Sequence, residues 1–249
     1  MTEKMYSTEY AVASDGTKVC FDSYARGHKN VVVIAHGYFN SKKSVLLKQL
    51  AKKLTDDYDC IVMDFRGHGQ TEGLFHWTTK EYLDLQAVLT YARTKYERTA
   101  VIGFSLGAAT SLITAAKFDL MDSLIAVSAP VAFREIEFHF WDLDIENDIL
   151  YNIIGNGKIG KGVRPGPFWL AKDKPNAVVE RIKIPVFYIH GDKDWLIRPW
   201  HAQALYDKTR SHKKLSIIKN GPHAEYLVRK NYDEFVGLIQ AWLNETLNA

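Results

Sequence analysis

The chain has few of the features that mark secreted or membrane proteins. Its two cysteines, Cys20 and Cys60, are too few for a disulfide framework. Both fall in strand-like segments, which favours buried, reduced thiols. No apolar run is long enough to cross a bilayer, and Met1 to Cys20 hold no stretch that fits a signal peptide. We therefore expect a cytoplasmic protein with no membrane partner.

The chain also lacks a strong excess of charge of either sign. Its formal net charge of +3 is too small to predict binding to nucleic acid or to an anionic membrane. The lysines are spread over predicted helix faces, where they indicate a solvated surface. We expect no nucleic-acid partner, and no pattern in the sequence indicates an oligomeric state. Examples of these lysines are Lys42, Lys43, Lys48, Lys52 and Lys53.

Short apolar segments alternate with amphipathic segments along most of the chain. With 249 residues, of which 47% are hydrophobic, the chain can bury the core of one large α/β domain or of two small ones. Asp15-Gly16 predicts a tight turn that joins the first two strands, and Thr78 with Glu81 predicts a capping box before a helix. The alternation predicts a mostly parallel sheet with helices on both faces. We expect strands at 10–14, 18–24, 31–35, 60–63, 99–102, 124–127, 185–189 and 215–218, and helices at 45–54, 82–92, 108–116 and 227–243.

The segment Gly103-Phe104-Ser105-Leu106-Gly107 is the most informative in the chain. It lies between the strand predicted at 99–102 and the alanine-rich helix predicted at 108–116. A serine at such a turn adopts a cramped backbone conformation, and glycines two residues before and after it remove side chains that would collide. The turn exposes the hydroxyl, and the helix N-terminus favours negative charge beside it. Ser105 is therefore a candidate nucleophile.

One long segment interrupts the alternation. Between Pro130 and Pro185 no strand of the main sheet is predicted, and the segment is rich in aromatic residues and glycine. An insertion of this kind usually covers a ligand site. We predict a core domain at 1–130 and 184–249 and a helical cap, or lid, at 131–183. A surface elaboration that packs only on itself is the alternative.

The segment Gly155-Asn156-Gly157-Lys158-Ile159-Gly160 matches a dinucleotide-binding fingerprint by its letters. That fingerprint functions only between a strand and a helix whose N-terminus meets the phosphate. Here the residues before it are predicted to be helical, and no helix opens directly after Gly160. We therefore expect no cofactor, and we expect no metal.

A serine nucleophile needs a base, and the base needs an acid that orients it. His223 follows the last predicted strand and precedes the last predicted helix, where its loop can reach the sheet edge. Asp192 and Asp194 both follow the strand ending at Ile189. The loop must carry the carboxylate past the strand end, which favours Asp194, while Asp192 is interpreted as a carboxylate that shapes the turn.

Acyl transfer also requires donors for an oxyanion. Two backbone N–H groups are predicted to supply them, that of Leu106 after the serine and that of Tyr38 in the loop after the third strand. Gly37 lets the backbone approach at this point.

Taken in order, these motifs resemble the α/β-hydrolase superfamily, and most closely its bacterial esterases of the cinnamoyl/feruloyl and monoacylglycerol-lipase-like groups. The resemblance implies an eight-stranded sheet with an antiparallel second strand, a triad of Ser105, Asp194 and His223, and no cofactor. It places Cys20 and Cys60 on adjacent strands, where a disulfide is an alternative, but we expect none because Cys60 opens its strand whereas Cys20 lies in the middle of its own. It also implies that Arg66 and His68 of the second motif brace the loop beside the site. The motifs are His36-Gly37-Tyr38, Asp64-Phe65-Arg66-Gly67-His68-Gly69, Gly103-x-Ser105-x-Gly107, Gly191-x-x-Asp194 and Gly221-Pro222-His223.

The expected function is that of a serine carboxylesterase acting on small to medium acyl or aromatic esters through an acyl-enzyme. We predict substrate contacts from Phe138, Trp141, Trp195 and His76, although Phe138 and Trp141 equally fit the core of the cap. Two alternatives remain: a hydrolase of thioesters, amides or carbon–carbon bonds on the same triad, and a ligand-binding protein on the hydrolase scaffold.

Overall fold

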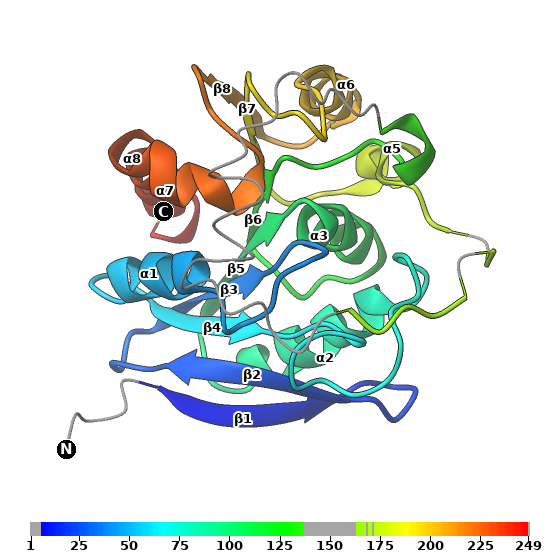
Figure 1. Ribbon diagram of the computed structural model, residues 1–249. Coiled ribbons are helices and arrows are strands. Elements are labelled where there is room, and N and C mark those ends of the chain that lie inside the picture. The colour runs from blue at the N-terminus through cyan, green and yellow to red at the C-terminus, as the bar shows by residue number, and fades with distance from the viewer. Residues whose placement is uncertain (1–5, 137–162, 168, 171, 249) are drawn as a thin grey trace.

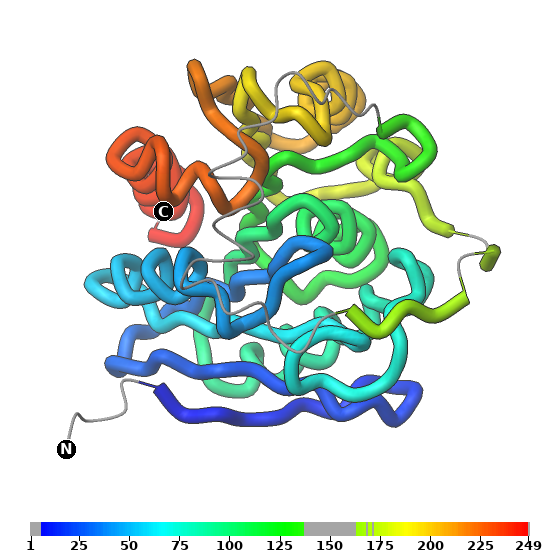
Figure 2. Tube along the Cα trace, viewed as in Figure 1, coloured from blue at the N-terminus to red at the C-terminus, as the bar shows by residue number. Residues whose placement is uncertain are grey.

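A single eight-stranded sheet organises the computed structural model, which describes residues 6–136, 163–167, 169, 170 and 172–248. The strand order is β1-β2-β4-β3-β5-β6-β7-β8. Strand β2 runs antiparallel to β1 and β4, and the other neighbouring strands are parallel. Figure 2 follows the chain from β1 at one edge to β8 at the other. The strands are β1 Ser7–Val12, β2 Lys18–Tyr24, β3 Asn30–Ala35, β4 Asp59–Met63, β5 Arg98–Phe104, β6 Ser123–Val127, β7 Val186–Gly191 and β8 Lys213–Ile218.

Helices cover both faces of the sheet (Figure 1). Helices α2, α3 and α6 pack on one face, and α1, α7 and α8 pack on the other. The predicted fold class, a mostly parallel α/β sheet between two helical layers, is therefore confirmed. The helices are α1 Val45–Leu54, α2 Glu81–Arg93, α3 Leu106–Lys117, α5 Pro175–Val178, α6 Trp200–Lys208, α7 Leu227–Lys230 and α8 Tyr232–Leu247, with short 3₁₀ turns η1 Phe133–Glu135, η4 Val179–Arg181 and η5 Ala224–Tyr226.

Strand β3 shows why the central strands read as continuous apolar runs. Its side chains alternate between the two faces, so Val31 and Val33 enter one core cluster while Val32 and Ile34 enter the other. All four are fully buried. Because helices cover both faces of the strand, none of its side chains faces solvent. The strand therefore lacks the polar residues that alternate with apolar ones in a half-exposed strand.

Two local predictions are wrong. Thr78 and Glu81 do not form a capping box, because α2 begins only at Glu81 and the Thr78 hydroxyl bonds the Trp77 carbonyl. The Glu81 carboxylate instead accepts the His76 N–H at 2.6 Å. The closing helix is also not continuous, because Asn231 has φ −126° and ψ 38° and separates α7 from α8.

The cysteines lie on neighbouring strands without pairing. Cys60 of β4 faces Tyr24 of β2, whereas Cys20 lies further along β2. Both are buried free thiols, as predicted, and burial raises the pKa of each. They are consequently inert packing residues.

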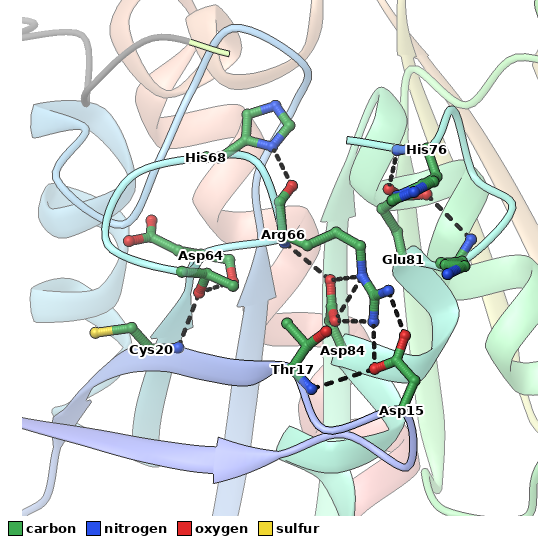
Figure 3. A network of polar contacts seen from close by, with 11 residues as sticks. Asp15, Thr17, Cys20, Asp64, Arg66, His68, His76, Glu81 and Asp84 are labelled. Carbon is green, nitrogen blue, oxygen red and sulfur yellow. Dashed lines mark hydrogen bonds and ion pairs between the residues drawn. The ribbon is translucent and has the colours of Figure 1, made fainter. Parts of the chain in front are cut away.

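A buried network around Arg66 ties the first hairpin to the loop after β4 and to α2 (Figure 3). Arg66 Nη2 lies 2.7 Å from Asp84 Oδ1, and its Nη1 lies 2.6 Å from Asp15 Oδ2. Side-chain exposure is 3% for Arg66, 0% for Asp84 and 27% for Asp15. Asp84 therefore depends on Arg66, whereas Asp15 keeps access to water.

Replacing Arg66 by methionine is expected to lower the free energy of unfolding by about 3–5 kcal/mol, because it leaves the Asp84 charge buried without a partner. Asp15→Asn is the matched control and is expected to cost less than about 1 kcal/mol, because solvent already reaches that carboxylate. Urea unfolding of both variants measures the difference. Equal losses in the two variants would contradict the assignment.

Candidate active site

Ser105 occupies a strained turn between β5 and α3. Its backbone has φ 50° and ψ −109°, which side-chain-bearing residues rarely adopt. A Cβ on Gly103 would lie 2.6 Å from the Gly107 carbonyl oxygen, and one on Gly107 would lie 2.2 Å from the Ala35 carbonyl oxygen. The two glycines are therefore required by close packing around the turn. The Ser105 N–H donates to the Val127 carbonyl at 2.8 Å and ties the turn to β6.

Asp194 and His223 form a buried pair at the carboxyl ends of β7 and β8. His223 Nδ1 lies 2.8 Å from Asp194 Oδ2. The other oxygen, Oδ1, accepts the N–H groups of Leu196 at 3.1 Å and Ile197 at 2.8 Å. Burial pushes the pKa of Asp194 up, but the charge of His223 and hydrogen bonds from His190 and His223 hold it well below its usual range. Asp194 is thus built to stay ionised and to orient the His223 ring.

The other aspartate of this loop is not part of the pair. Oδ1 of Asp192 is buried and has no hydrogen-bond partner among the described residues. The structure therefore joins Asp194, the aspartate further from the strand end, to His223.

His190 also contacts Asp194, which the sequence did not predict. Its Nε2 lies 2.6 Å from the Ile197 carbonyl oxygen and 3.3 Å from Asp194 Oδ2. A carbonyl oxygen only accepts, so Nε2 carries the ring proton. The spacing of four residues between His190 and Asp194 was the available signal in the sequence.

A second contact absent from the sequence analysis fixes the His223 loop. The Ala224 N–H donates to the Ser128 hydroxyl at 3.0 Å, and the Ser128 N–H donates to the Ile189 carbonyl at 2.9 Å. Ala224 has φ 49° and Ser128 has φ 51°, so both are strained. The end of β6 therefore holds the loop that carries His223.

Tyr38 lies on a loop supported by two histidines. His36 Nδ1 is 2.7 Å from the Gly37 carbonyl oxygen, and its Nε2 accepts the Phe65 N–H at 3.1 Å. His68 Nε2 lies 2.6 Å from the Tyr38 carbonyl oxygen. Burial lowers the pKa of both imidazoles to about 4, and the neighbouring His36 contributes to the shift of His68. Neutral rings thus brace the loop.

Among the described residues, no acceptor receives the backbone N–H of Tyr38 or of Leu106. Leu106 is the first residue of α3, where the helix leaves its N–H groups without partners. The two predicted oxyanion donors are therefore available for a ligand.

The chain matches the family model of the alpha/beta hydrolase fold over residues 30–148. It is 28% identical over 229 residues to the uncharacterized protein YqkD of Bacillus subtilis, covering 83% of this chain and 71% of the relative. The esterase Pf2001 of Pyrococcus furiosus superposes with a TM-score of 0.74 at 21% identity, over 97% of this chain and 92% of its own. The esterase RhEst1 of Rhodococcus sp. ECU1013 superposes with a TM-score of 0.78 at 18% identity, over 96% of this chain and 99% of its own.

The chain has the α/β-hydrolase fold. The family match and the sheet order confirm the predicted resemblance to the α/β-hydrolase fold, and the solved esterases share that fold.

The predicted substrate contacts are only partly described. Phe138 and Trp141, with the glycine motif at 155–160, lie outside the described residues. Trp195 is half-buried beside Asp194. His76 is also half-buried, and its Nε2 lies 3.6 Å from the position of a Cβ on Gly166. His76 thus lies against residues 163–167, which belong to the predicted cap.

That segment of the predicted cap, residues 163–167, docks on the loop after β4. Phe75 pairs with it by a single β-bridge, in which its N–H donates to the Arg164 carbonyl at 2.8 Å and its carbonyl accepts from Gly166 at 2.7 Å. The Arg164 N–H donates to the Gly67 carbonyl at 2.8 Å. The division into core and cap at 131–183 remains a prediction.

The described residues contain neither a metal-binding cluster nor a membrane-spanning helix. Within these residues no group of three or more histidine, cysteine, aspartate or glutamate side chains is arranged to hold a metal ion. In the same part of the chain, no helix has the length and apolar character needed to cross a membrane.

The two neutral histidines predict how stability depends on pH. Unfolding returns each imidazole to a pKa of 6.5 from about 4. The unfolded chain therefore binds more protons, and stability is lost as pH falls from 6.5 towards 4. His36→Gln is expected to flatten this loss by up to about 3 kcal/mol. Urea unfolding at several pH values between 6.5 and 4 measures this loss of stability. Replacement of the exposed His212 by glutamine is the control and is expected to keep the wild-type dependence on pH. An equally steep loss in His36→Gln would refute the assignment.

Proposed function

We propose that the protein is a serine hydrolase that cleaves carboxylic esters through an acyl-enzyme. The observation that carries the proposal is the buried Asp194–His223 hydrogen bond of 2.8 Å, in a fold whose strained turn presents Ser105. Ser105, with 9% exposure, and His223, with 8%, are each nearly enclosed. Such an enclosed site favours electrostatic catalysis.

The proposed mechanism follows from the tautomer of His223. Because Nδ1–H donates to the Asp194 carboxylate, Nε2 is left as the acceptor for the Ser105 proton. The Ser105 oxygen attacks the ester carbonyl, and the Tyr38 and Leu106 N–H groups stabilise the oxyanion. The imidazolium then protonates the leaving alcohol. Water, activated by the same imidazole, releases the acid from the acyl-enzyme.

The proposed substrates are small to medium acyl or aromatic esters. The esterases among the solved structures of this fold support ester chemistry as the first choice. Two of the proposed contact residues are described: Trp195 follows Asp194 in the chain, and His76 lies against the 163–167 segment. Together with Phe138 and Trp141, they are proposed to contact the acyl or alcohol group.

A fluorophosphonate probe and a ladder of p-nitrophenyl esters test the nucleophile. Wild-type protein is expected to label at Ser105 and to hydrolyse the esters, because the probe reacts with an activated serine. Ser105→Ala is expected to lose both the label and the turnover. Intact-mass measurement locates the label. No labelling and no turnover across the ladder would instead favour a ligand-binding protein.

Substitution of each aspartate in the loop after β7 tests which one orients His223. Asp194→Asn is expected to lower kcat by about 10⁴-fold, because an amide favours the wrong imidazole tautomer. Asp192→Asn is the matched control and is expected to keep kcat within about threefold, because its carboxylate does not touch His223. Steady-state hydrolysis of p-nitrophenyl butyrate measures both. A larger loss in the Asp192 variant would reverse the assignment.

A further inference from the structure

Glu225 is a nearly buried carboxylate that the proposed mechanism does not use. It lies two residues after His223 in the turn η5, with only 7% of its surface exposed. The Asn40 side-chain amide donates a hydrogen bond to its Oε1. Asn40 belongs to the same loop as Tyr38, since its N–H donates to the Gly37 carbonyl at 3.1 Å. Glu225 therefore joins the loop of the proposed base to the loop of the proposed oxyanion donor.

The position of Glu225 relative to the nucleophile follows from Gly37. A Cβ built on Gly37 would lie 3.4 Å from Glu225 Oε2 and 3.6 Å from the Cβ of Ser105. Both groups therefore border the small space beside Gly37, and Oε2 lies within about 7 Å of the Ser105 Cβ. The carboxylate therefore lies within reach of a charged group on an acyl chain attached to Ser105.

Glu225 has no counter-ion among the described residues. In the part of the chain that the structure describes, its partner is the neutral Asn40 amide, and no lysine or arginine forms an ion pair with it. A nearly buried carboxylate without a counter-ion exerts a strong field on a ligand, because little solvent screens it. A positive charge placed nearby gains energy, and a negative charge loses it.

We propose that Glu225 is a specificity-determining residue that makes the site favour esters carrying a cationic group near the reacting carbonyl and disfavour esters carrying an anionic group there. This inference rests on the proposed esterase function and specifies its substrate class. A charge about 6 Å from the carboxylate changes kcat/KM about tenfold in each direction relative to a neutral ester.

Three p-nitrophenyl esters test the inference on the full-length protein. Their acyl chains have four methylene groups and end in a methyl, a trimethylammonium or a carboxylate group. Wild-type protein is expected to rank them in kcat/KM as trimethylammonium, then methyl, then carboxylate. Glu225→Gln keeps the shape and an acceptor for Asn40 but removes the charge. It is expected to reduce the ratio between the two charged esters by about a hundredfold, because a tenfold effect is lost for each of them.

The matched control is Glu97→Gln, which removes an equal charge from an exposed surface ion pair with Lys29. It is expected to keep the wild-type ratio. Asn40→Ala distinguishes charge from positioning: if Glu225 only holds the loop, both Asn40→Ala and Glu225→Gln lower kcat for all three esters alike and leave the ratio unchanged. That result, or equal kcat/KM for the two charged esters in wild type, overturns the inference.

A second measurement does not depend on the folding of any variant. Wild-type Ser105 is expected to label faster with a fluorophosphonate that has a trimethylammonium tail than with one that has a carboxylate tail. Equal labelling rates overturn the inference while leaving the esterase proposal standing. Absence of labelling by every probe, with no ester turnover, removes the esterase proposal and the inference with it.

Discussion

The strained backbone of Ser105 is the constraint on which the rest of the site depends. A side-chain-bearing residue at φ 50° is costly and persists only where its surroundings enforce it. Here close packing of α3 against β3 holds the turn, because Gly107 lies so near the Ala35 carbonyl that no side chain fits between them. Strand β3 runs directly into the loop that carries Tyr38. One contact therefore sets both the direction of the serine and the distance to the loop proposed to bind the oxyanion.

Buried hydrogen bonds fix the loops that surround this turn. His68 supports Tyr38, His190 contacts Asp194, and Ser128 holds the N–H of Ala224. The bonds of His68 and Ser128 join segments that follow different strands, whereas the contact of His190 lies between the end of β7 and the loop after it. All three are enclosed by protein. Because water does not compete for these groups, the bonds hold the loops in one arrangement, and losing one partner leaves the other unsatisfied. The site is thus organised by buried histidines and the Ser128 hydroxyl as well as by its proposed catalytic groups.

The sequence was sufficient for the parts of the molecule that depend on local patterns. The Asp15-Gly16 turn identified the first two strands, and the apolar runs identified the other six. The glycines around Ser105 identified the strained turn. All of these signals lie within a few residues. The capping box at Thr78 failed because α2 begins only at Glu81, whose carboxylate accepts the N–H groups of His76 and of the N-cap residue Lys80. The contacts of Ser128 and Glu225 were not predictable, since each depends on which distant strand ends become neighbours. Single sequences do not encode such pairings in any local motif.

The Glu225 carboxylate has two opposite effects on the proposed reaction, and their balance depends on its distances from the substrate oxygen and from His223. A carboxylate near Ser105 opposes the negative charge that develops on the substrate oxygen, yet it also stabilises the positive charge that develops on His223. Both charges arise in the same step, so their effects largely cancel when the carboxylate is equally distant from the two. A fixed charge on the acyl or alcohol group has no such compensation. The proposed effect of Glu225 therefore falls on the choice of substrate more than on the rate for neutral esters.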